Sequence, residues 1–429
     1  MANRLFALLA TAAVLSSAVP ATALTIVLND TGGFTTNQAA LDDFRAAAAY
    51  WQSVITTNVT VYIDISLASL PTNVLGSTST TQTNHAVQFV ESRLMAGASA
   101  SGVDQTVVAN LPTLVTSGSG AGAINVITPG YTDATAGTGI DTSKGVYDTV
   151  GSFTIPGDAS NDNNNTYIGM STANAKALGY TFVAGASDAS IQFSSDFAFD
   201  YNPRDGIDPN KLDFVGVATH EIGHALGFLS GVDTYDELGT GSPNASANCG
   251  SAAAPLLCQN LPAQQYAIGD VLDLFRFSND PNKLNGGKPT LDWTTATDSF
   301  FSLDGGKTSL ALYSTGAYTG DGSQASHWKD NQYFRGTPGC PIAGVSIGIM
   351  DPTFAPCQGG IISAIDLAAF DAIGWTLNVD ALKTPAYAFT TAQVADLVPE
   401  PSTWAMMIVG FGMTGAMWRR AARSRNEFA

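Results

Sequence analysis

Residues 213–233 (DFVGVATHEIGHALGFLSGVD) form the segment that most restricts what this chain can fold into. Their apolar side chains recur at helical spacing, so the segment predicts an amphipathic helix. Asp213 precedes the first apolar residue and is a suitable N-cap. Gly227 follows the last apolar pair and is placed to end the helix in a left-handed conformation. The fold must therefore bury the apolar face of this helix.

The same helix carries a group of residues suited to metal chemistry. His220 and His224 are four residues apart, so both imidazoles project from one helix face and can share a metal ion. Zinc accepts histidine nitrogen in this geometry. Glu221 follows the first histidine and can reach a water beside such a metal, where it would act as a general base. The alternative is a chance HExxH on a surface helix, which the apolar context and Gly227 disfavour.

The pattern HEIGHALG resembles the metzincin clan of zinc proteases. In most of that clan a third ligand stands three residues after the glycine, where this chain has Ser230, a poor ligand. The leishmanolysin-like branch instead supplies a late histidine in a Ser-His-Trp setting, and this resemblance implies His327. Asp233 is the second candidate for the third ligand, with a calcium or helix-end role as its alternative. We expect one catalytic zinc ion on His220, His224 and His327.

The segment 346–352 (SIGIMDP) looks like the metzincin Met-turn, in which Met350 would form a hydrophobic floor under the metal. Its alternative is an ordinary core methionine. The chain has four cysteines, which allow three pairings in an exported protein. We expect nearest neighbours to pair, as 249–258 and 340–357, and the second bond would brace this turn. Residues 362–375 predict a closing helix, like the one that follows the Met-turn in several secreted zinc proteases.

The N-terminal part of the chain predicts strand, helix and strand over 25–28, 38–55 and 59–67. The last of these alternates apolar and polar residues, as a half-buried strand does. A further strand over 190–199 is expected to be the sheet edge on which an extended substrate lies. With the metzincin resemblance, the fold class predicted is α+β: a metzincin-like catalytic domain with a mixed twisted sheet, an active-site helix and a loop-rich C-terminal subdomain.

Other segments of the body are less informative. Residues 86–95 and 171–178 predict short helices, and 98–150 predict mostly loop and short strand. Residues 158–165 (DASNDNNN) are either a solvated loop or a structural calcium site. The fourth histidine, His85, is expected to be solvated.

The two ends of the chain are expected to be targeting segments. Residues 1–23 read as a signal peptide, with Arg4, an apolar run and a small-residue cleavage site. Residues 399–429 resemble the PEP-CTERM sorting signal of exported bacterial proteins, with Pro-Glu-Pro at 399–401, an apolar stretch and a terminal arginine cluster. The resemblance implies a transient membrane anchor and cleavage by an exosortase-type enzyme of a Gram-negative bacterium. The alternative is an ordinary tail anchor.

Composition and these segments together predict the domain organisation. The formal net charge of −18 disfavours binding to nucleic acid or to an anionic membrane. We expect a signal peptide over 1–23, an N-terminal catalytic subdomain over 24–231 and a C-terminal subdomain over 232–378. A linker over 379–398 and the sorting tail over 399–429 follow. The mature protein is expected to be a monomer, secreted or held at the cell surface or in the extracellular matrix.

The sequence therefore predicts a secreted zinc endopeptidase that acts on protein or peptide substrates, with Glu221 as its general base. One alternative is a non-catalytic matrix or surface-binding protein, which the Gly-, Ser- and Thr-rich composition and the sorting tail would suit. A second is a zinc hydrolase that cleaves a non-peptide bond.

Overall fold

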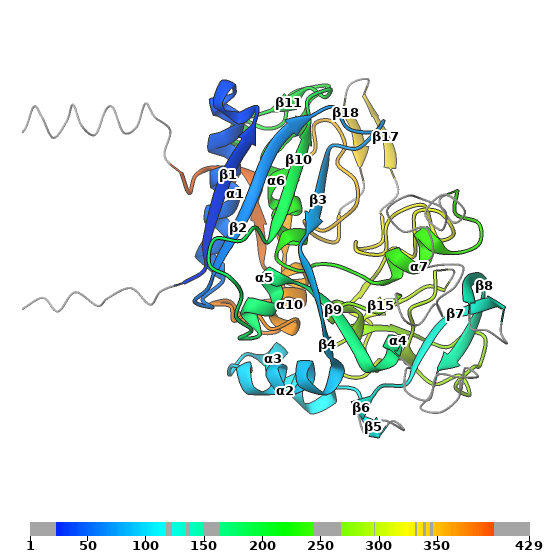
Figure 1. Ribbon diagram of the computed structural model, residues 1–429. Helices are drawn as coiled ribbons and strands as arrows, with labels where there is room; N and C mark the ends of the chain where they lie inside the picture. The colour runs from blue at the N-terminus through cyan, green and yellow to red at the C-terminus, as the bar shows by residue number, and fades with distance from the viewer. Residues whose placement is uncertain are drawn as a thin grey trace, which may run out of the picture.

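The computed structural model describes residues 23–116, 122–133, 138–148, 163–243, 267–295, 297–330, 333–337, 340–343 and 346–398. A four-stranded mixed sheet carries the helix predicted to hold the metal (Figure 1). Its strands are β1 (Thr25–Gly32), β2 (Thr60–Ala68), β10 (Ala189–Ser194) and β3 (Gly76–Thr80), in the order β1-β2-β10-β3. β1, β2 and β10 are mutually parallel, and β3 pairs antiparallel with β10. The predicted α+β class with a mixed sheet is confirmed.

The strand order corrects one prediction. β10 was expected to be the edge strand, but it pairs with β2 on one side and with β3 on the other. β3 is the edge strand at that side of the sheet. The single strand predicted over 190–199 is divided in the structure. β10 ends at Ser194, and Phe199–Asp200 form a separate strand, β11, which pairs with β12 (Leu212–Asp213).

Two helices cover one face of this sheet, α1 (Gln38–Val54) and α6 (Phe214–Ala225) (Figure 1). The alternation in β2 explains this packing, because Val61, Ile63 and Ile65 are fully buried and their neighbours are not. An aromatic cluster joins the sheet to both helices. Its rings come from Phe34, Phe44, Phe193, Phe199 and Phe214. Since Phe214 begins α6, this cluster anchors the start of that helix in the core.

The rest of the described chain forms smaller units around this sheet. The helices and short helical turns there are α2 (Val87–Gly97), α3 (Gly102–Asn110), α4 (Asn163–Thr166), α5 (Thr172–Ala177), α7 (Val232–Leu238), α10 (Ala364–Ala372) and α11 (Thr391–Ala395), with η1 (Phe34–Thr36), η2 (Pro203–Asp205) and η4 (Val271–Phe275). Antiparallel pairs are β4 (Gln82–Ala86) with β9 (Tyr167–Ser171), β5 (Val115–Thr116) with β6 (Gly122–Ala123), β7 (Val126–Asp133) with β8 (Thr138–Asp148), β17 (Tyr333–Thr337) with β18 (Cys340–Ala343), and β19 (Ile361–Ser363) with β20 (Ala388–Thr390). A second four-stranded sheet has the order β14 (Thr290–Leu291), β13 (Arg276–Ser278), β15 (Phe300–Phe301) and β16 (Ala311–Leu312).

Several local predictions need correction. Residues 98–150, expected to be mostly loop and short strand, do contain the short strands β5 and β6, but also α3 and the long hairpin of β7 and β8. α3 forms because Ser101 caps it by accepting from Asp104 N, and Val103 and Val107 are buried. Residues 379–398 are not a linker, since they contain β20 and α11, in which Val394 and Ala395 are buried. The predicted helices over 38–55, 86–95, 171–178 and 362–375 correspond to α1, α2, α5 and α10.

Candidate metal centre and cleft

The helix α6 places His220 and His224 on one face, as the sequence predicts. Asp213 is the N-cap: one carboxylate oxygen accepts from Gly216 N at 2.9 Å, and the other accepts from Gly360 N at 2.9 Å. The second bond ties the start of α6 to the segment that leads into α10. Gly227 has φ +112°, which ends the helix in the left-handed region as expected. All residues of α6 are buried, so the two histidines lie inside the protein.

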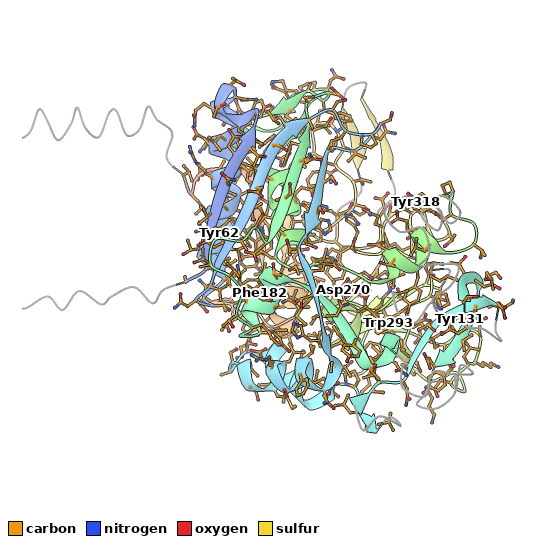
Figure 2. All side chains as sticks on the ribbon, in the orientation of Figure 1. Tyr62, Tyr131, Phe182, Asp270, Trp293 and Tyr318 are labelled. Carbon is orange, nitrogen blue, oxygen red and sulfur yellow. The ribbon has the colours of Figure 1, made fainter. Side chains whose placement is uncertain are left out.

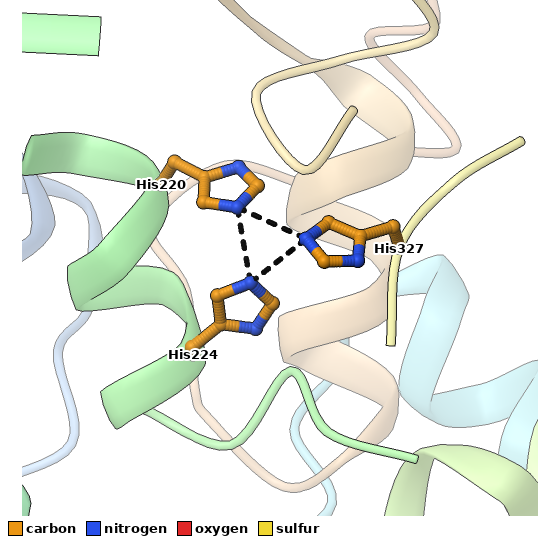
Figure 3. A group of neighbouring side chains, drawn as sticks. All are labelled: His220, His224 and His327. Atoms are coloured by element: carbon orange, nitrogen blue, oxygen red, sulfur yellow. Dashed lines mark hydrogen bonds between the residues drawn. The ribbon is translucent and has the colours of Figure 1, made fainter. Parts of the chain in front are cut away.

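His327 completes a group of three imidazoles that we call the trihistidine cluster (His220, His224 and His327; Figure 3). The three Nε2 atoms converge: they are 3.0 Å apart between His224 and His220, and 3.2 Å apart in each pair that includes His327. His327 is 103 residues after His224, so tertiary structure alone brings it there. Within the described ranges, this is the one set of three His, Cys, Asp or Glu side chains close enough to share a metal ion.

Hydrogen bonds to the backbone fix the tautomer of each histidine. The Nδ1 atoms of His220, His224 and His327 contact the carbonyl oxygens of Ile349, Phe228 and Gln324 at 2.8, 2.8 and 3.1 Å. A carbonyl can only accept, so each Nδ1 carries the hydrogen and donates it. The neutral rings then present three unprotonated Nε2 lone pairs to one another.

Burial keeps these rings neutral. It lowers the pKa of His220 to about 3 and that of His224 to about 4, and it holds the pKa of His327 well below its usual value of 6.5. Three neutral rings with Nδ1–H cannot donate to each other through Nε2. A cation would relieve the mutual repulsion of these lone pairs. Tetrahedral zinc at about 2.0–2.1 Å from each nitrogen requires nitrogen atoms about 3.3–3.4 Å apart, close to the observed spacing.

The segment around Met350 packs against α6 and forms hydrogen bonds next to the cluster. Met350 is fully buried, and its sulfur packs against α6 at Gly223. Its carbonyl oxygen accepts from the backbone N–H of Trp328 at 3.0 Å, and the preceding carbonyl, of Ile349, accepts from His220. The segment therefore contacts the first histidine directly and the third through its neighbour. Cys357 is disulfide-bonded; its pairing with Cys340 stays a prediction, since the side chain of Cys340 and residues 249 and 258 lie outside the described parts.

Asp233 lies in the first turn of α7, in line with the helix-end alternative, and not at the ligand position considered for it. Its carboxylate accepts from the backbone N–H groups of Ala325 and Ser326, at 2.6 and 3.2 Å. It therefore holds the loop that carries His327, and it does not belong to the trihistidine cluster. The buried Arg276 supports the same loop by donating to the carbonyl oxygen of Ala325 at 3.2 Å. Ser230, at the position where most metzincins have a ligand, donates to Asp273 at 2.7 Å.

Glu221 lies beside the cluster and faces the edge strand β3. Thr78 Oγ1 donates to Glu221 Oε2 at 2.6 Å, and it lies 3.0 Å from the carbonyl oxygen of the same residue. Burial raises the pKa of Glu221 to about 7, and the hydrogen bond from Thr78 opposes this shift. A buried carboxyl group with this pKa can exchange a proton near neutral pH.

The trihistidine cluster and Glu221 open into a cleft of ≈ 1190 Å³. β3 lines one side with Gly76, Ser77 and Thr78, and the segment after Met350 lines another with Pro352, Thr353 and Phe354. Asp270 and Tyr318, both labelled in Figure 2, also line it, and Asp270 lies against Gly169 of β9. The edge of β3 beside the trihistidine cluster is an arrangement that can accept an extended peptide chain.

Sequence reasoning missed two residues that organise the site, Thr78 and Asp366. Thr78 lies in a short polar strand without apolar alternation, and nothing local links it to Glu221. Asp366 accepts from Ile349 N at 2.9 Å and from the side chain of Trp328 at 2.8 Å. It is also part of a capping box with Ser363 at the start of α10, and this Ser-x-x-Asp pattern is a signal that could have identified it.

Two further predictions concern residues outside the cleft. His85 was expected to be solvated, but its ring is half-buried and stacks on Tyr180 with centroids 3.8 Å apart. Burial lowers its pKa. The possible calcium site at 158–165 falls largely outside the described residues.

Comparison with known protein families identifies the C-terminal segment: residues 397–421 match the PEP-CTERM protein-sorting motif. This signal indicates export, processing of the tail, and delivery to the cell surface or extracellular space, and it implies recognition by an exosortase-type sorting enzyme. No curated protein and no solved structure matches the chain. Across the described ranges, the helices are too short or too polar to span a bilayer.

Proposed function

We propose that this exported protein is a zinc-dependent endopeptidase of metzincin-like architecture. The observation that carries the proposal is the convergence of three neutral histidine Nε2 atoms, 3.0–3.2 Å apart, next to the buried carboxyl group of Glu221. The buried Met350 beneath α6 and the strand edge along the cleft support it. The sorting motif is consistent with a site of action outside the cell.

In this mechanism His220, His224 and His327 would hold the metal through Nε2. When bound, zinc would polarise a water molecule and the carbonyl of the scissile bond. The carboxylate of Glu221 takes the proton of the attacking water and later delivers it to the leaving nitrogen. The edge strand β3 aligns the substrate by pairing with its backbone.

The residues around the cluster keep its geometry before substrate arrives. The carbonyl oxygens of Ile349, Phe228 and Gln324 hold the three rings in the tautomer that a metal requires. Asp233 and Arg276 hold the loop of the third histidine. Because the side chains are already held in place, less free energy is needed to order the site for reaction.

Cleavage of an unfolded general substrate such as casein tests the proposal. Purified protein covering 24–398 would be compared with Glu221→Gln, which keeps the shape of the side chain but cannot serve as a base. We expect one zinc ion per chain in both proteins and a loss of about 10²–10⁴-fold in cleavage rate in the variant. Equal cleavage by both would contradict the role of Glu221. Equal zinc content with no cleavage by either would favour a binding protein, and cleavage of ester or amidase substrates alone would favour a non-peptide hydrolase.

A further inference from the structure

The edge strand β3 contacts both oxygens of the Glu221 carboxyl group. Thr78 Oγ1 is 2.6 Å from Oε2. Gly76, two residues earlier, lies against the other oxygen: a Cβ built there would be 2.6 Å from Oε1. Residues two apart in a strand face the same side, so one face of β3 meets the whole carboxyl group. Thr78 supplies a donor to one oxygen, and Gly76 leaves space for the other.

The hydroxyl of Thr78 has a single hydrogen and two possible acceptors. Besides Oε2, the carbonyl oxygen of Glu221 lies 3.0 Å from Oγ1. An ionised carboxylate attracts the hydrogen more strongly than a neutral carbonyl, and its contact is also the shorter one. Oε2 is therefore the anchored oxygen while Glu221 is ionised, and Oε1 keeps its lone pairs free beside Gly76.

The position of Thr78 is fixed by the sheet. In the antiparallel pair of β3 and β10, Thr78 lies opposite Ile191 and Gly76 lies opposite Phe193. Ile191 and Phe193 are fully buried, so a shift of register would move both out of the core. The β-branched side chain of threonine also has few rotamers available. The hydroxyl is thus held at one place relative to α6.

We propose that Thr78 is a positioning residue for Glu221 and that it assigns separate roles to the two carboxylate oxygens. Oε2 stays hydrogen-bonded to Thr78 throughout. Oε1 accepts the proton of the attacking water and passes the same proton to the leaving nitrogen, so Thr78 neither gains nor loses a proton. This inference rests on the proposed peptidase function, and it adds the group that directs its general base.

Kinetics of Thr78→Val and Thr78→Ser test this role in the zinc-loaded protein, with a peptide derived from casein as substrate. Valine keeps the branched shape without the hydroxyl, and serine keeps the hydroxyl. We expect kcat to fall about 10- to 100-fold in Thr78→Val, with KM within about twofold and zinc content unchanged. Thr78→Ser should restore kcat to within about threefold of the wild type. Thr31→Val, which removes a hydroxyl group from β1 at the opposite edge of the sheet and away from the cleft, is the matched control and should behave as the wild type.

Other outcomes would overturn the inference. An unchanged kcat in Thr78→Val, or an equal loss in Thr78→Ser, would show that the hydroxyl does not position the base. Failure of the peptidase function itself would appear separately, as a wild type without Glu221-dependent cleavage. Crystal structures then decide the matter without activity: we expect one carboxylate orientation in the wild type and more than one in Thr78→Val. A single, unchanged orientation in the variant would refute the positioning role.

Discussion

The indole N–H of Trp328 donates to the Asp366 carboxylate at 2.8 Å, and this bond links the third histidine to the first. Trp328 follows His327 directly in the chain. Asp366 also accepts from Ile349 N at 2.9 Å, and the carbonyl oxygen of Ile349 accepts from His220. One buried carboxylate on α10 thus orders the supports of two candidate ligands that are 107 residues apart.

Replacing Asp366 should weaken metal binding without touching a ligand. Asp366→Ala would leave the N–H groups of Trp328 and Ile349 without their acceptor in the interior. We expect zinc affinity to fall about 10- to 100-fold and the free energy of unfolding to fall by about 2–4 kcal/mol. Asp366→Asn, which keeps one acceptor oxygen, should lie between wild type and alanine. Competition with a chromophoric chelator measures the affinity, and wild-type affinity in the alanine variant would exclude the link.

Zinc content should differ between variants of the two candidates for the third ligand, His327 and Asp233. His327→Ala removes an Nε2 atom from the trihistidine cluster, so stoichiometric zinc should be lost at micromolar metal. Asp233→Ala removes the acceptor for Ala325 N and Ser326 N, which should loosen the loop and weaken zinc binding about tenfold at most. Metal content after gel filtration distinguishes them. Retained zinc in the histidine variant, with loss in the aspartate variant, would reverse our assignment.

Much of the site could be predicted from the sequence because its signals are local. His220, Glu221 and His224 lie within one helical turn, and their face follows from the 3.6-residue period. The alternation over 59–67 likewise predicts β2, because one face of that strand is buried. For His327 the spacing itself carried no information, and only the Ser-His-Trp resemblance pointed to it.

The rest depended on contacts between distant segments. β3 has the sequence GSTST, without apolar alternation, so its place at the sheet edge arises from pairing with β10, more than a hundred residues later. Asp233 looked like a possible ligand because its partners Ala325 and Ser326 are more than ninety residues away. The hairpin of β7 and β8 was missed because Pro129 and Gly130 interrupt β7, and because small polar residues and glycine dominate β8. Such pairings carry no periodic signal within a short window.

Metal removal should destabilise the folded protein. Without a cation, three buried Nε2 lone pairs face each other at 3.0–3.2 Å, and a bound metal stabilises only the folded state. A thousandfold excess of free zinc over Kd corresponds to about 4 kcal/mol. We therefore expect EDTA to lower Tm by several degrees, and zinc to restore it. His85→Ala, which removes the histidine outside the cluster, should keep this response. A Tm that EDTA leaves unchanged in the wild type would contradict a metal site at the cluster.

The buried carboxyl group of Asp43, which lies outside the trihistidine cluster, should make the free energy of unfolding depend on pH. It is buried in α1, one carboxylate oxygen has no hydrogen-bond partner, and burial, with the nearby Asp213, raises its pKa from 3.8 to about 8. Between these values the folded chain holds a proton that the unfolded chain releases, so this contribution to stability is complete below about pH 4 and is lost as pH rises through about 8. Asp43→Asn stays neutral throughout, so its free energy of unfolding should exceed that of the wild type by about 1–3 kcal/mol more at pH 8 than at pH 5. Urea titrations at both pH values measure the free energy of unfolding. The control is Asp42→Asn, which removes the neighbouring carboxyl group paired with Arg45 and should keep most of the wild-type change in this free energy between pH 5 and pH 8. An equal change in the wild type and in Asp43→Asn would mean that Asp43 does not bind this proton.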